Sequence, residues 1–159
     1  MVIDKSYPET TVDSKGRYQE MVDTLRDVGC RMTPQRLALL HILSSADNHP
    51  SARQLYEELR QQFPTTSLAT VYKTLNVLKD LGEVNEMGFG SGDNRYDAIH
   101  RSPHPHLVCM QCNRIVDADA APLSAVDRDL AASTGFQIVS HRLEFFGICP
   151  DCQAKGDTN

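Results

Sequence analysis

The sequence predicts an α+β protein in two parts: short helices that end in a β-hairpin, then a smaller α/β part held by cysteines. Three observations predict this class. Apolar residues recur at helical spacing between capping residues up to position 82. A glycine-rich loop then separates two short extended runs. Two Cys-x-x-Cys pairs stand in the last third of the chain.

The 159 residues (17.7 kDa) suffice for one ordinary domain or two small ones. Apolar residues make up 40% and charged residues 23%, which is typical of globular chains and excludes a largely disordered one. No apolar run approaches the roughly 18 residues of a membrane span, and residues 1–13 lack a hydrophobic signal core. We therefore expect a soluble, cytoplasmic protein.

Four helices are expected in the first part. The first covers residues 17–28 and ends at Gly29, a residue type that closes helices. The other three begin after residues whose hydroxyl groups cap a helix N-terminus: Thr33, Ser51 and Ser67. Gly82 stands just beyond the fourth helix.

Extended runs at 83–87 and 95–98 flank the loop 88–94, which predicts a β-hairpin with a flexible tip. Helices followed by such a hairpin make a winged helix-turn-helix, an architecture that reads DNA. The outward face of the fourth helix carries hydroxyl, aromatic, cationic and amide groups that suit a major groove: Thr70, Tyr72, Lys73 and Asn76. The alternative is an ordinary solvated helix face.

The net charge of -5 argues against a strongly basic nucleic-acid binder. The charge is unevenly distributed, however. Residues 14–82 carry nine Lys and Arg against seven Asp and Glu, whereas residues 83–159 carry six against eleven. The mildly basic first part permits DNA contact without proving it.

Four of the five cysteines form two pairs separated by 36 residues, and the pairs predict one structural zinc site of four thiolates: Cys109, Cys112, Cys149 and Cys152. Two redox-active pairs or two disulfides are the alternatives. Cys30 is expected to be a small packed side chain.

The second part is expected to fold as β-β-α-β. Its strands are predicted at 106–110 and 114–118, and a long strand at 136–148. A helix at 122–133 should turn Leu123, Val126 and Leu130 inward. So small a unit buries little surface, and a zinc ion and a homodimer would both stabilise it. DNA-binding modules that recognise pseudo-palindromic operators are commonly dimeric.

The expected organisation is therefore a flexible N-terminus (1–15), a winged-helix DNA-binding domain (16–98), a linker (99–103), a dimerisation and metal-binding domain (104–153) and a tail (154–159).

His104 and His106 stand on the same side of an extended segment, because strand side chains repeat every two residues. They face away from Cys109, which predicts a second metal site separate from the thiolates. Asp97, Asp117 and His49 are the residues that could join them. The alternative is that each is an ordinary surface polar group.

Four motifs together resemble the ferric uptake regulator family: Arg31-Met-Thr-Pro-Gln-Arg36, Ser67-Leu-Ala-Thr-Val-Tyr-Lys-Thr-Leu75, His104-Pro-His106 before Cys109-x-x-Cys112, and Cys149-x-x-Cys152. The resemblance covers residues 16–153 and is strongest to the peroxide-sensing repressors. It implies a regulatory Fe(II) or Mn(II) held by His49, Asp97, His104, His106 and Asp117. It also implies that Arg31 reaches a minor groove and that Tyr72 and Lys73 contact the operator.

The resemblance further implies that peroxide, through iron, oxidises His49 and His104 to 2-oxo-histidine and releases the DNA, so that the protein is a repressor and not an enzyme. A repressor that responds to iron, manganese or zinc availability is the alternative, and Asp at position 117 is the feature against it. A zinc-ribbon enzyme or redox protein using the cysteine pairs is a further one. His141 matches a ligand of an additional site in relatives, but Pro105 and Ser124 stand at its carboxylate positions. His100 could compete as a ligand.

Overall fold

The computed structural model describes residues 13–46, 48–88, 93–99, 104–118, 124–139 and 141–156. The chain divides into two compact units, Met1–Ile99 and His100–Asn159. Several predictions lie outside the described residues. These concern segment 1–12, the hairpin tip 89–92, the linker residues 100–103, the tail 157–159, His100 and the inward orientation of Leu123.

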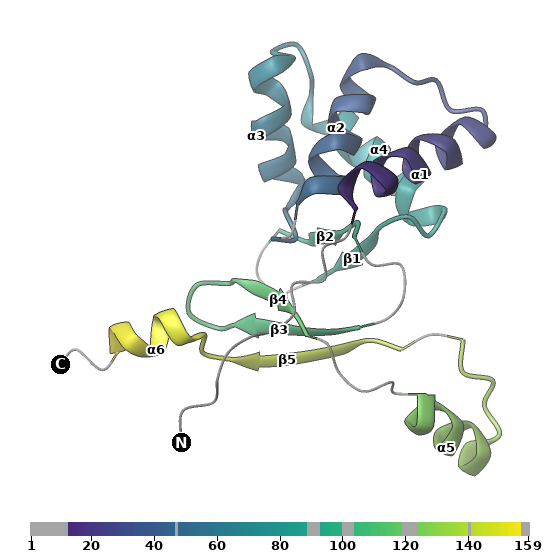
Figure 1. Cartoon of the computed structure of the whole chain (residues 1–159), viewed down its shortest axis with the longest axis vertical. Coiled ribbons are helices and arrows are strands. Elements are labelled where there is room, and N and C mark those ends of the chain that lie inside the picture. Colours follow the sequence, from purple (N-terminus) through teal and green to yellow (C-terminus); the bar gives the residue numbers. More distant parts are fainter. Residues whose placement is uncertain are drawn as a thin grey trace. The chain divides into compact units, whose positions relative to one another are not determined.

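Four helices form the first unit (Figure 1): α1 (Ser14–Asp27), α2 (Pro34–Ser45), α3 (Ala52–Gln62) and α4 (Leu68–Asp80). The side chains of Thr33, Ser51 and Ser67 cap the last three helices, as predicted. The first helix begins three residues earlier than expected because Asp13 caps it, accepting from the backbone N–H of Lys15 at 3.1 Å. Gly29 and Gly82 have φ of 75° and 71°, the left-handed conformation that favours glycine at helix ends.

The core of this unit is built from the inward faces of the four helices. Fully buried side chains come from every one of them: Met21 and Leu25, Leu39, Leu40 and Leu43, Leu55 and Leu59, and Val71, Leu75 and Leu78. Removing these apolar surfaces from water supplies most of the stability of the unit. Their helical spacing is what made the helices predictable from sequence.

The hairpin follows α4 and completes a winged helix-turn-helix. Strands β1 (Asn85–Met87) and β2 (Arg95–Asp97) pair antiparallel, with Met87 opposite Arg95. Both strands are shorter than predicted. Residues 83 and 84 lie in a bend before β1, where Glu83 accepts from buried Arg17.

A buried ion pair joins α1 to the two ends of this hairpin. The Arg17 side chain is 4% exposed, and its Nη1 lies 2.7 Å from Glu83 Oε2. Its Nε donates to the carbonyl oxygen of Ala98 at 2.5 Å. The guanidinium thereby fixes the chain where it leaves β2, one residue after Asp97.

The second unit is a three-stranded sheet with two helices (Figure 1). Strands β3 (Pro105–Cys109), β4 (Ile115–Asp117) and β5 (Leu143–Gly147) lie in the order β4-β3-β5. Strand β3 pairs antiparallel with β4 and parallel with β5. Helix α5 (Ser124–Thr134) connects β4 to β5, and α6 (Pro150–Gly156) follows β5.

Three expectations for this unit are corrected. Of the described residues in the predicted long strand, those at 143–147 pair with the five residues of β3. The predicted inward orientation of Val126 and Leu130 is wrong for the single chain, where these side chains are 51% and 49% exposed. Helix α6 was not expected, although Pro150 at its first position and Asp151 in its first turn favour a helix start.

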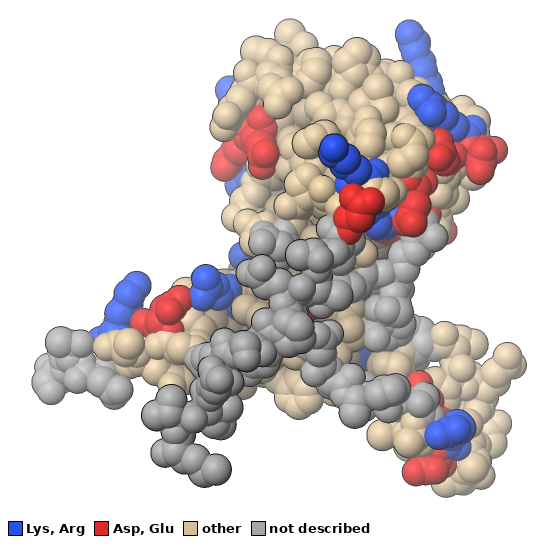
Figure 2. Space-filling view, in the orientation of Figure 1, with Lys and Arg blue, Asp and Glu red and all other residues tan. Residues whose placement is uncertain are grey.

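None of the described helices is long and apolar enough to cross a membrane. On the face drawn in Figure 2, Lys and Arg side chains of the helical unit lie among Asp and Glu side chains. That mixture agrees with the nearly balanced charge of residues 14–82.

Candidate metal centres and the exposed face of α4

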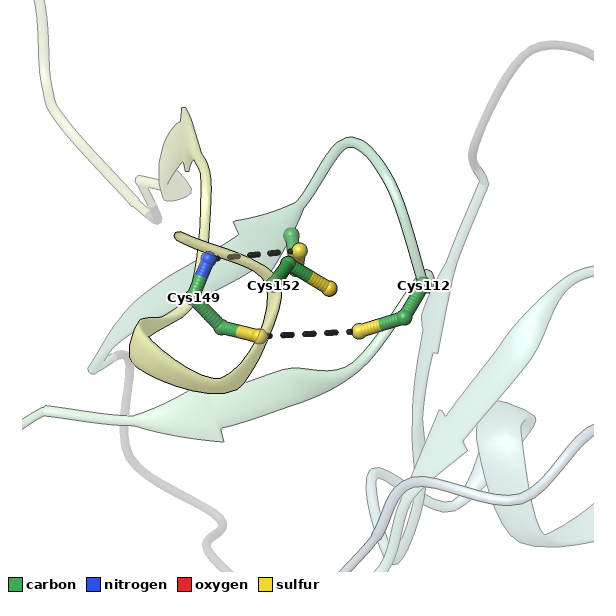
Figure 3. Close-up of side chains that lie close together, drawn as sticks. Cys112, Cys149 and Cys152 are labelled. Carbon is green, nitrogen blue, oxygen red and sulfur yellow. Dashed lines mark hydrogen bonds between the residues drawn. The ribbon is translucent and has the colours of Figure 1, made fainter. Parts of the chain in front are cut away.

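The four paired cysteines converge in the second unit. Their sulfur atoms all lie within 4.8 Å of one another: Cys109, Cys112, Cys149 and Cys152. Figure 3 shows Cys112, on the turn between β3 and β4, pointing toward Cys149 and Cys152 at the start of α6. All five cysteines of the chain, Cys30 included, are free of disulfide bonds.

Local backbone geometry brings the two pairs together. The first pair sits in a tight turn in which Asn113 adopts φ of 57°, and its N–H donates to the carbonyl of Cys109 at 2.9 Å. Asparagine tolerates this left-handed conformation better than most residues. Across the cluster, Arg114 Nη1 lies 2.7 Å from Asp151 Oδ2, which ties the first turn to α6.

The cysteine cluster fits a tetrahedral zinc ion. Cys112 Sγ and Cys149 Sγ are 3.7 Å apart (Figure 3). Four thiolates at the usual Zn–S distance of about 2.3 Å place neighbouring sulfurs about 3.8 Å apart. A disulfide would require about 2.05 Å. The spacing therefore matches shared metal coordination and not a disulfide.

Backbone hydrogen bonds prepare this cluster for a cation. The pKa of Cys109 is lowered to about 6, first by the backbone N–H of Cys112 and then by that of Cys149, which donates to Cys109 Sγ at 3.3 Å. The pKa of Cys152 is raised to about 12, because its thiol proton is shared with Cys149 and because burial disfavours the thiolate. A divalent ion would replace these protons and satisfy all four sulfurs at once.

The second unit also holds three of the five nitrogen and oxygen donors. His104 Nε2 and His106 Nε2 lie 3.3 Å and 3.5 Å from the same atom, Asp117 Oδ1. The two imidazole rings are 4.3 Å apart between centroids. His106 on β3 is the register partner of Asp117 on β4, so the sheet itself sets this proximity.

The helical unit holds the other two donors. A ring nitrogen of His49 and a carboxylate oxygen of Asp97 lie within 4.8 Å of each other, and both residues are 2% exposed. His49 lies in the turn before α3, and Asp97 is the last residue of β2. Asp97 Oδ1 also accepts from the backbone N–H of Ile99 at 2.9 Å.

Imidazole nitrogens and carboxylate oxygens, with no thiolate among them, suit Fe(II), Mn(II) or Zn(II). Each unit presents a buried or half-buried histidine beside an aspartate, so the donor chemistry fits a divalent ion. This donor set shares no residue with the cysteine cluster. The structure therefore keeps the two predicted metal sets separate.

The residues expected to face DNA are exposed in the helical unit: Arg31, Thr70, Tyr72, Lys73 and Asn76. The last four follow one side of α4, while Val71 and Leu75 on its other side are fully buried. The hydroxyl of Thr70 lies 3.0 Å from that of Ser67, so it also supports the helix cap.

Three further polar residues make contacts that the sequence pattern does not predict. Arg17 and Arg95 make side-chain hydrogen bonds to backbone carbonyls near Asp97 and His49. Asp127 on α5 pairs with His141, their Oδ2 and Nδ1 atoms being 3.0 Å apart. No spacing signal marks such contacts, because each joins residues far apart in the chain or outside regular elements.

A winged helix-turn-helix unit, a sheet unit with a four-cysteine cluster and a histidine–aspartate donor set define a class of metal-binding regulators. The model of the ferric uptake regulator family matches residues 27–146. The chain belongs to the ferric uptake regulator family.

Similar proteins include the peroxide-responsive repressor PerR of Staphylococcus aureus (strain USA300). It is 39% identical over 137 residues, which cover 86% of this chain and 92% of the relative. A solved structure of PerR from Streptococcus pyogenes, described as a basis for peroxide sensing and gene regulation, is 33% identical with a TM-score of 0.50 and covers 86% and 93% of the two chains. A zinc uptake regulator complexed with zinc and DNA is 25% identical with a TM-score of 0.68, covering 91% and 98%.

Proposed function

We propose that this protein is a metal-dependent transcriptional repressor that senses hydrogen peroxide and then releases its operator DNA. The observation that carries the proposal is the donor set of histidines and aspartates present in the two units. The similarity to PerR of S. aureus over most of both chains supports the same function.

Two metal sites have different roles in this proposal. Zn²⁺ bound by the four cysteines is structural, since four thiolates leave no open position. One regulatory Fe²⁺ or Mn²⁺ is assigned to five ligands: His49, Asp97, His104, His106 and Asp117. Because these ligands belong to both units, binding the ion favours one arrangement of the DNA-binding units, and DNA in turn favours the metal-bound state.

A homodimer presents two such DNA-binding units to a pseudo-palindromic operator. The surface of the sheet supports this assembly. Leu107 is the register partner of both Val116 and Phe145, so these three side chains form one row across the sheet. They are 45%, 48% and 51% exposed, and a second copy of the chain would cover them.

Contact with DNA is assigned to the exposed face of α4 and to Arg31. Hydroxyl and amide groups of α4 can bond base edges, Lys73 can neutralise a phosphate, and Arg31 can reach a minor groove. The solved complex of the zinc uptake regulator with DNA supports this use of the fold.

When bound, Fe²⁺ would supply the redox chemistry that activates peroxide, while the two electrons that peroxide takes up come, in balance, from an imidazole ring of the chain. The chain supplies the atoms that are oxidised, which are ring carbons of His49 and His104. One oxygen atom of hydrogen peroxide replaces the hydrogen on such a carbon to give 2-oxo-histidine, and the other leaves as water. The altered ring binds metal poorly, so the DNA-binding arrangement is lost. Each chain reacts with peroxide at its own residues and is consumed, which is not enzymatic turnover.

A repressor that responds only to metal availability is the second candidate. Its support is the likeness to the zinc uptake regulator, which shares the fold. The two candidates share every residue of the regulatory site and differ in whether peroxide releases the DNA.

Metal-dependent operator binding tests the part that both candidates share. We expect Mn²⁺ to raise the affinity of the zinc-loaded protein for its operator at least about tenfold. The operator is obtained by selection from a random duplex pool. His104→Ala should lose this stimulation but remain folded. His41→Ala is the matched control, since His41 is an exposed histidine on α2 packed against Tyr18 and outside both donor sets. Unchanged stimulation in His104→Ala would refute the regulatory site.

A further inference from the structure

His49 adopts a backbone conformation that requires support. Its φ of 49° lies in the left-handed region, which residues with a Cβ atom seldom occupy. Such conformations persist when surrounding contacts enforce them. The turn around His49 is therefore expected to have a specific anchor.

Strand β2 of the hairpin supplies part of that anchor. The backbone N–H of Tyr96 on β2 donates to the carbonyl of Pro50 at 3.0 Å, and Ser51 forms an antiparallel bridge with Arg95. The segment that carries His49 thus lies against the same strand that carries Asp97. Two ligands of the proposed metal site are joined through one short sheet contact.

Arg95 makes the contact that reaches His49 itself. Its Nη1 donates to the carbonyl oxygen of His49 at 3.1 Å and to Gln54 Oε1 at 3.1 Å. Gln54 is part of the capping box of α3, because its Oε1 accepts from the N–H of Ser51 at 2.8 Å. One guanidinium therefore fixes the His49 peptide relative to both α3 and β2.

We propose that Arg95 is a positioning residue that holds the imidazole of His49 in place for metal binding. The proposal rests on the proposed function, which assigns His49 and Asp97 to one ion. Without this guanidinium, the turn can relax toward a commoner φ and carry the ring away from Asp97. Because Arg95 belongs to β2, it also connects the proposed ligand His49 to the hairpin of the helical unit.

Mn²⁺ affinity of zinc-loaded protein, measured from the electron paramagnetic resonance signal of free Mn²⁺, tests the proposal without peroxide or DNA. Arg95→Gln should weaken binding about tenfold, as loss of a group that orients a metal ligand does. Arg95→Lys should be intermediate, since an ammonium group has enough donors for both acceptors but the lysine side chain is one bond shorter than the path to Arg95 Nη1. Arg53→Gln is the matched control and should bind normally. It removes another arginine that links α3 to the hairpin, 3.4 Å from Asp93 Oδ2, without contact to His49.

A double-mutant cycle separates positioning from a general structural effect. In a His49→Ala background, Arg95→Gln should cause no further loss of Mn²⁺ affinity, because the ring to be positioned is gone. An equal loss in both backgrounds, or wild-type affinity of Arg95→Gln, would overturn the proposal. If Arg95→Gln does not fold, Arg95→Lys decides, and wild-type affinity of that variant overturns it. Wild-type affinity of His49→Ala would instead overturn the assigned donor set, which is a failure of the proposed function.

Discussion

At the scale of single residues, Asp117 is the residue whose carboxylate lies beside both histidines of the sheet unit. One of its oxygens, Oδ1, lies within 3.5 Å of the ring nitrogens of both His104 and His106. The short side chain places that atom beside β3, where the register fixes His106. A glutamate would carry the carboxylate one methylene farther and alter its approach to the two rings.

Asp117→Glu should therefore keep the Mn²⁺-dependent affinity for the operator within about threefold of the unaltered protein. It should slow the release of DNA by peroxide about tenfold or more, because the longer side chain changes the geometry of the ligands. Release of a fluorescent operator from iron-loaded protein measures this. Asp127→Glu is the control, since Asp127 lies on α5 and pairs with His141. Equal release rates for Asp117→Glu and the unaltered protein would show that this residue does not set peroxide sensitivity.

At the scale of elements, Glu86 joins α4 to the hairpin of β1 and β2. Its Oε2 accepts from Lys79 Nζ at 2.7 Å, and its Oε1 accepts from Asn94 Nδ2 at 2.7 Å and from Tyr96 Oη at 3.1 Å. These donors come from α4, the loop before β2 and β2 itself. The hydrogen bond from Lys79, above all, lowers the pKa of Glu86.

The lowered pKa predicts a pH-dependent stability of the helical unit. The contribution of the Glu86 carboxylate to the free energy of unfolding is fully present above the pKa of about 4.5 that this group has in the unfolded chain. It is lost as the pH falls through the lower pKa of the folded state. Burial first, and then the hydrogen bond to Glu86, raises the pKa of Tyr96. The contribution of the neutral Tyr96 side chain to the free energy of unfolding is therefore fully present below pH 10 and is lost at more alkaline pH.

Glu86→Gln should reduce the free energy of unfolding at pH 7 and flatten its fall between pH 5 and 3. Urea unfolding across this pH range measures both effects. Glu57→Gln, which removes an exposed carboxylate from α3, is the control. If Glu86→Gln retains the full acid sensitivity of the unaltered protein, other carboxyl groups are responsible.

The sequence predicted those elements whose signals are local. Caps such as Thr33 and Ser51 and the Cys-x-x-Cys spacing act over three or four residues, so their predictions match the structure. The end of a strand depends instead on its partner, and β5 extends only as far as β3 pairs with it. Exposure of Val126 likewise depends on what else packs against α5.

The residues of the candidate site likewise differ in how far local sequence patterns predict them. The spacing of His104 and His106 was sufficient to predict that they face one side, because a strand repeats every two residues. Asp117 and Asp97 could be named only as residues able to join them, and the resemblance to the family supplied the set. Arg95 could not be predicted, because its bonds to His49 and Gln54 join β2 to segments more than forty residues away.

At the scale of the whole molecule, the exposed apolar row on the sheet is the kind of surface that a second copy of the chain would bury. Leu107 occupies the middle of the row, between its register partners Val116 and Phe145. Burying such side chains between two copies gains about 25 cal/mol for each Å² of apolar surface removed from water. An ionised side chain in the middle of that contact would be desolvated without compensation.

Leu107→Asp should therefore shift the zinc-loaded protein from dimer to monomer and raise the dimer dissociation constant at least about a hundredfold, which sedimentation equilibrium measures. Val28→Asp is the control, because Val28 is a similarly exposed apolar residue at the end of α1 in the helical unit. A Leu107→Asp protein that remains dimeric at the concentrations where the unaltered protein does would place the interface elsewhere.

The most direct test of the central claim compares iron-loaded and manganese-loaded protein. Zinc-containing protein is charged with Fe²⁺ or Mn²⁺, bound to operator and treated with micromolar peroxide, and its peptides are then analysed by mass spectrometry. Only the iron form should release DNA and gain one oxygen on the peptides that contain His49 or His104. Retention of DNA by both forms without modification, or oxidation confined to the cysteines with loss of zinc, would contradict that claim.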